Sequence, residues 1–117
     1  MAQPSASDAA GLQFSVMMWT LKSHGTFEEN LERIAQAGYR HVELVGEFKK
    51  WSEADWQRIL ARMKALGVTV DATTGVAQGF ADPAGGDTFI SELKEFIPIA
   101  HRLQARQLIL VSGKRIE

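Results

Sequence analysis

The stretch Gly38-Tyr39-Arg40-His41-Val42-Glu43-Leu44-Val45-Gly46-Glu47 decides the fold of this chain. A glycine closes the amphipathic segment before it, five residues of strand composition follow, and a second glycine ends the strand. Val42 and Leu44 lie two apart, so Glu43 lies on the opposite face of the strand. The pattern predicts a half-buried β-strand that follows a helix and carries a carboxylate.

The same helix-to-strand design recurs in residues 65–75 and 103–113, and each copy ends in a glycine turn. Repeated passages of this kind predict βα units in one parallel sheet. With the alternating segment 12–20 as the first strand, the chain has about four strands and three helices. We expect the strands at 12–20, 41–45, 68–73 and 107–112.

The helices are predicted from their caps and apolar stripes. Thr26 and Glu29 form a capping box, and the helix that they start ends at Gly38. Ser52 caps the second helix, where Trp51 and Trp56 have the spacing of a hydrophobic staple.

For the third helix, Asp87 is the expected cap. This helix contains Pro98, which removes one main-chain hydrogen bond and predicts a kink.

Composition excludes several classes of function. The chain has 117 residues, enough for one domain, and a formal charge of −1, which gives no case for nucleic acid or an anionic membrane. It has no cysteine, so disulfides, thiolate metal sites and a cysteine nucleophile are excluded. No run approaches the ~18 apolar residues of a membrane span.

Residues 1–11 are small and polar, with neither basic residues nor an apolar core, so they read as a disordered leader before a domain at 12–117. The absence of cysteine favours a cytoplasmic protein. The alternative is an exported protein whose signal peptide was removed upstream of this leader.

Two parallel architectures compete. A doubly wound sheet is covered on both faces and is apolar on both. Here the first three strands each keep a polar face, which suits the interior of a β/α barrel built round a ligand. We therefore favour the barrel and predict one inward row, formed by Ser15, Glu43, Asp71 and Thr73. A complete barrel of this kind needs about 200 to 250 residues, so the chain is expected to be a half-barrel.

Three segments carry a resemblance to a known family. They are 14–19 (FSVMMW), 37–46 (AGYRHVELVG) and 108–115 (LILVSGKR), and the Gly-x-x-x-Val-Glu-Leu phrase is the most specific item. Together they resemble the sugar phosphate isomerase/epimerase superfamily, the xylose-isomerase-like TIM barrels, and within it the hydroxypyruvate-isomerase-like branch. The resemblance spans residues 13–115 and only the N-terminal half of the family.

The resemblance implies isomerisation or epimerisation next to a carbonyl, through an enediolate, in carbohydrate metabolism. In the family a divalent metal (Mg, Mn or Zn) polarises the oxygens and a pair of glutamates moves the proton. Those glutamates and most metal ligands lie on strands five to eight of the family. No catalytic or metal residue is therefore assigned here, and tight metal binding by this chain is not expected.

The expected substrate-binding residues lie at the C-terminal ends of the strands, where such barrels build their sites. Trp19 is placed to cover a sugar-like or 2-oxo acid substrate, and core packing is the competing interpretation. Glu43 faces inward, either toward substrate or into a structural ion pair. His41 and Asp71 are more readily explained as structural hydrogen-bonding groups than as metal ligands.

The run Ser112-Gly113-Lys114-Arg115 joins a glycine turn to two cations. Main-chain N–H groups and paired cations suit a carboxylate or phosphate, so Ser112, Lys114 and Arg115 are also expected to bind substrate. The competing interpretation is a solvated loop after a strand.

Two functional hypotheses follow. The first is the N-terminal fragment of a metal-dependent sugar or 2-oxo acid isomerase or epimerase, expected to be inactive on its own. The second is a self-standing α/β module that binds a small ligand or pairs with itself without catalysis. In both, the exposed strand edges predict self-association or a homo-oligomer.

Overall fold

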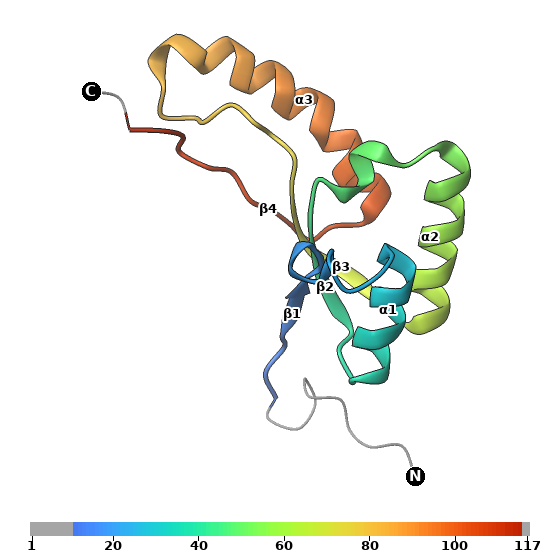
Figure 1. Cartoon of the computed structure of the whole chain (residues 1–117). Helices are drawn as coiled ribbons and strands as arrows, with labels where there is room; N and C mark the ends of the chain where they lie inside the picture. The colour runs from blue at the N-terminus through green and yellow to red at the C-terminus, as the bar shows by residue number, and fades with distance from the viewer. Residues whose placement is uncertain (1–10, 116–117) are drawn as a thin grey trace.

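The computed structural model describes residues 11–115, in which strands and helices alternate (Figure 1). The predicted leader therefore lies outside the described residues, apart from Gly11. The strands are β1 (Ser15–Met17), β2 (His41–Val45), β3 (Thr69–Thr74) and β4 (Gln107–Leu108). The α-helices are α1 (Phe27–Gln36), α2 (Glu53–Leu66) and α3 (Gly86–Leu103). Short 3-10 helices are η1 (Met18–Leu21), η2 (Glu47–Lys50) and η3 (Pro83–Gly85).

The strands form one sheet in the order β1-β2-β3-β4, with every pair parallel. Parallel neighbours need a crossover connection, and each helix supplies one. The fold class is therefore α/β with four parallel strands and three helices, as the sequence predicts.

Helices α1 and α2 pack on one face of the sheet. Val42 and Leu44 of β2 are fully buried beneath them, together with Leu31 of α1 and Ile59 of α2. The alternation read from the central stretch thus identifies the buried face correctly. We call the other face of the sheet, which carries Glu43, the open face.

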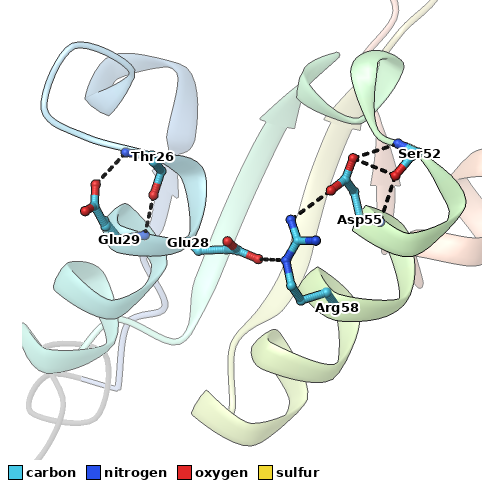
Figure 2. A network of polar contacts seen from close by, with 6 residues as sticks. All are labelled: Thr26, Glu28, Glu29, Ser52, Asp55 and Arg58. Carbon is cyan, nitrogen blue, oxygen red and sulfur yellow. Dashed lines mark hydrogen bonds and ion pairs between the residues drawn. The ribbon is translucent and has the colours of Figure 1, made fainter.

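The predicted Thr26–Glu29 capping box is present, and the predicted Ser52 cap forms a second capping box with Asp55 (Figure 2). The Ser52 hydroxyl accepts from the Asp55 N–H at 3.1 Å, and the Asp55 carboxylate accepts from the Ser52 N–H at 2.8 Å. The two helices are tied together as well, because Arg58 of α2 pairs with Glu28 of α1 at 2.6 Å and with Asp55 at 2.8 Å.

An aromatic cluster joins α2 and α3 to the C-terminal end of the sheet. The rings of Trp51 and Trp56 meet edge to face with centroids 5.1 Å apart, which confirms the predicted staple. Phe48 of η2 lies 6.2 Å from Trp56 and stacks on Phe96 of α3 at 5.8 Å. Gly75 is required here, because a Cβ on it would lie 2.4 Å from the Phe96 ring.

Thr73 lies on the helix-covered face, which corrects its predicted place in the inward row. Val42 pairs with Val70 but Leu44 pairs with Thr73, so β3 carries one extra residue between these pairs, a β-bulge. Paired residues of neighbouring strands point to the same side, so Thr73 follows Leu44. It is fully buried, and its hydroxyl donates to the Leu44 carbonyl oxygen at 3.0 Å. Strict alternation gives no sign of a bulge.

The outer strands are shorter than predicted. β1 ends at Met17, because Met18 begins η1. β4 ends at Leu108, because the following segment leaves β3: the N–H groups of Phe80 and Ala81 donate to the carbonyl oxygens of Val111 and Ser112. Figure 1 shows this segment running beside the one that follows β3.

The expected Asp87 cap of α3 is also wrong. The Asp82 carboxylate instead accepts from the Ala84 N–H at 2.9 Å, which starts η3. The chain passes directly from η3 into α3, so Gly85 occupies the cap position and the helix begins at Gly86. Pro98 lies inside α3, as predicted.

We predict that Trp56→Ala lowers the free energy of unfolding by about 3–5 kcal/mol, the usual cost of removing a buried Trp. The side chain is 8% exposed and contacts aromatic rings on two sides. Urea unfolding followed by circular dichroism measures the change. The matched control is Trp19→Ala, a tryptophan that is 50% exposed. A loss at Trp56 no larger than that of the control would contradict the buried cluster.

We also predict that the Ser52–Asp55 box makes stability depend on acidity. The Ser52 main-chain N–H, then its hydroxyl, then Arg58 lower the pKa of Asp55 below its ordinary 3.8. A lowered folded-state pKa means that this stabilisation is present above 3.8 and is lost as the pH falls through the folded value.

Asp55→Asn is therefore expected to be less stable than the wild type at about pH 5, and the difference should shrink toward about pH 2.5. Urea unfolding at both pH values checks this. Ser91→Ala, at an exposed serine within α3, is the control. A deficit in Asp55→Asn that persists unchanged in acid would show that the carboxylate charge contributes nothing.

Candidate functional site

The open face carries a row of polar side chains from neighbouring strands. The Ser15 hydroxyl donates to the Asp71 carboxylate at 3.0 Å, across the width of β2. His41 Nδ1 and the Thr69 hydroxyl are 3.1 Å apart. Glu43 is half-buried in the same row. The sequence therefore places Ser15, Glu43 and Asp71 on this face correctly. The bond from Ser15 is the structural hydrogen bond that we expect for Asp71.

Trp19 and Glu43 lie close to the same end of the sheet. Met17 pairs with Glu43, and Trp19 follows two residues later in η1, beyond the end of β1. Trp19 is 50% exposed, so it is not a core residue, and the Lys22 ammonium lies 4.6 Å from its ring centroid. An exposed indole held by a cation offers a flat surface to a ligand.

A cleft of about 560 Å³ brings together the other three predicted residues, Ser112, Lys114 and Arg115. It lies beyond the C-terminal end of the sheet, between the segments that follow β3 and β4. Trp19 and Glu43 do not line it. We call this the C-terminal cleft.

Two glycines let the walls of the C-terminal cleft approach each other closely. A Cβ on Gly79 would lie 2.3 Å from the Gly113 Cα, so only glycine permits the approach. Gly113 itself has a φ of 109°, which other residues rarely adopt. The Glu92 carboxylate of α3 accepts from the N–H groups of Ala77 and Gln78, at 2.9 and 2.8 Å, and so holds this loop in place.

Gln78 and Asp82 also line the C-terminal cleft, and sequence reasoning missed both. Residues 74–87 read as a long loop rich in glycine and alanine, with no periodicity to show which side chains face inward. Asp82 is already engaged as the cap of η3. Within residues 11–115, Lys114 and Arg115 make no ion pair, so their charge is available to an anion.

A metal does not fit the described part of the chain. Among residues 11–115, no three His, Asp or Glu side chains are close enough together to hold an ion. His41 and Asp71 are each engaged with a hydroxyl group, and they belong to separate hydrogen bonds. No helix in the described range is long and apolar enough to cross a membrane.

Comparison by sequence finds no relatives: no protein-family profile and no curated protein matches this chain. Comparison by structure finds solved proteins with a similar fold. An AP endonuclease, family 2, from Brucella melitensis superimposes with a TM-score of 0.67 at 19% identity. The probable 3-DHS dehydratase AsbF of Bacillus anthracis, involved in petrobactin synthesis, superimposes with a TM-score of 0.65 at 12% identity.

These likenesses concern the fold. They cover 82% and 83% of this chain but only 39% and 37% of the two solved chains. The four strands and three helices therefore match part of a TIM barrel. This agrees with the barrel predicted from the polar strand faces, and at these identities the likeness assigns no family.

Proposed function

We propose that this chain forms the substrate-binding wall of a sugar or 2-oxo acid isomerase or epimerase of the hydroxypyruvate-isomerase-like kind. The observation that carries the proposal is the C-terminal cleft. It opens where parallel β/α barrels build their active sites, and it presents two cations that make no ion pair within residues 11–115.

Each wall residue has a role set by its chemistry. Lys114 and Arg115 bind the carboxylate or phosphate of the substrate through charge-assisted hydrogen bonds. The Ser112 hydroxyl donates a further bond to the same group. Trp19 and Glu43 do not line the C-terminal cleft but lie at the same end of the sheet. Their proposed role is with the part of the substrate outside this cleft: Trp19 covers an apolar face of its carbon chain, and Glu43 accepts from a hydroxyl.

The reaction proposed for the whole enzyme is proton transfer between carbons next to a carbonyl, through an enediolate. In the family that this sequence resembles, a divalent metal supplies Lewis-acid chemistry and paired glutamates move the proton. Because residues 11–115 do not fit a metal, this chain's part is to bind and orient the anionic end of the substrate. The two structural neighbours are an AP endonuclease and a probable dehydratase, so the proposed isomerase activity rests on the sequence resemblance.

We predict that the chain binds hydroxypyruvate more tightly than dihydroxyacetone, a similar ketone without a charge. Lys114→Ala/Arg115→Ala should weaken hydroxypyruvate binding by about tenfold or more, because ionised partners contribute roughly 1.5–3 kcal/mol each. Nuclear magnetic resonance titration of the labelled chain measures both affinities and locates the signals that move.

The matched control is Lys49→Ala/Lys50→Ala. These neighbouring cations lie in η2, which follows β2 at the same end of the sheet, but they do not line the C-terminal cleft. Equal binding by both double variants, or equal binding of the charged and neutral ketones by the wild type, would contradict an anion site at Lys114 and Arg115.

A second candidate function is self-association, and the exposed open face favours it. Parallel sheets are almost always covered on both faces. Here Met17 and Val45 are 38% and 37% exposed, and Val111 in the segment after β4 is 48% exposed. The outer edges of β1 and β4 make no strand pairs in the described residues. We propose that a second copy covers this face, since two sets of four strands make an eight-stranded barrel.

Association is expected to rise with concentration, from monomer to dimer, in multi-angle light scattering. Met17→Lys/Val45→Lys should shift the equilibrium toward monomer, because each added charge loses hydration when the face is covered. The control is Ile90→Lys, at a residue of α3 that is 47% exposed. A wild type that remains monomeric throughout, or a dimer indifferent to the open-face lysines, would contradict the proposal.

A further inference from the structure

A second and larger cleft lies at the other end of the sheet. Its volume is about 840 Å³, within the usual ~300–1,000 Å³ of small-molecule sites. It is bounded by the second half of α2, the beginnings of β2 and β3, and the chain around the end of α3. We call it the N-terminal cleft, because the strands begin there.

The position of α3 explains why this cleft is open. Arg102, one residue before the end of α3, pairs with Glu53 at 2.5 Å and lies 4.5 Å from the Trp56 ring centroid. Both contacts are in the first turns of α2. The chain then reverses at Gln104, which has a left-handed φ of 53°. The second half of α2 is therefore left without α3 beside it, and a hollow remains.

The wall of the N-terminal cleft is apolar. Leu60 and Met63 of α2, Val68 before β3 and Leu103 of α3 all line it. Leu60 is half-buried and offers accessible apolar surface, while Met63, Val68 and Leu103 are nearly fully buried, at 4%, 3% and 3% exposure, and form the fixed floor beneath it. Such a surface suits a hydrocarbon or aromatic group.

The rim of the same cleft is cationic. Lys64, Arg102 and Arg106 line it, and His41 lies at the end that touches the sheet. None of its lining residues, all of which belong to the described range, is Asp or Glu. Within residues 11–115 only Arg102 of these three cations has an ion-pair partner.

Two acidic residues contact residues of this rim, and the carboxylates of both are already engaged. Glu53 pairs with Arg102, and Asp71 accepts from Ser15 through its carboxylate. Asp71 meets Arg106 only through the main chain, where its carbonyl oxygen accepts from the Arg106 N–H at 3.1 Å. Lys64 and Arg106 thus present two charges beside an apolar surface.

We propose that the N-terminal cleft binds a small amphipathic carboxylate. Its apolar part lies against Leu60, Met63 and Leu103, and its carboxylate pairs with Lys64 and Arg106. A guanidinium binds a carboxylate through two parallel hydrogen bonds, and the ammonium adds a point charge. A neutral molecule of the same shape gains only the apolar contact. This site is independent of the C-terminal cleft and of the proposed isomerase function.

The test compares decanoate with decanol, two probes that differ in the charged group. The labelled 117-residue chain is titrated with each probe, below the concentration at which decanoate forms micelles, and amide signals are followed. Decanoate should shift Gly67, Val68 and Gln104, which line the cleft, and should bind about tenfold or more tightly than decanol. Lys64→Ala/Arg106→Ala should remove that preference.

Lys49→Ala/Lys50→Ala again serves as the charge-matched control, and it should keep the preference for decanoate. Circular dichroism of both double variants checks that the fold is retained. If Lys64→Ala/Arg106→Ala unfolds, Lys64→Gln and Arg106→Gln are tested singly. Equal binding of the two probes, a preference unchanged in the cleft variants, or shifts confined to open-face residues such as Met17 and Val45 would overturn the proposal.

Discussion

The pairing of β2 between β1 and β3 is the interaction on which the rest of the structure depends. Val42 and Leu44 are both fully buried, and parallel ladders run along both sides of their strand. Parallel ladders require crossovers, so they place α1 and α2 on the same face of the sheet. The cost is an open face on the other side, where Met17 and Val45 meet water.

The two clefts arise where helix α3 and its neighbours depart from regular βα packing. At the C-terminal end of the sheet, Gly79 and Gly113 let two segments approach closely, and Lys114 and Arg115 follow this contact. At the N-terminal end, α3 stops opposite the start of α2 and leaves the rest of that helix uncovered. Each cleft contains two cations that make no ion pair in the described range. They are Lys114 and Arg115 in the C-terminal cleft, and Lys64 and Arg106 in the N-terminal cleft.

Much of the candidate site was predictable, because its residues follow strands whose ends meet in a parallel sheet. Trp19 and Glu43 lie beyond or near the ends of neighbouring strands, and Ser112, Lys114 and Arg115 line one cleft. Gln78 and Asp82 were not predictable, because an aperiodic loop does not show which of its side chains face inward. The N-terminal cleft was not predictable either, since its walls come from segments that are far apart in the chain.

By itself the sequence determined the order of elements, the Thr26 capping box, the Ser52 cap and the tryptophan staple. These depend on contacts within a few residues, as between Ser52 and Asp55 or Trp51 and Trp56. Only the tertiary structure decided that Thr73 turns to the buried face and that β4 is short. Both depend on which distant segment satisfies a main-chain hydrogen bond or fills the core, and local periodicity carries no record of that choice.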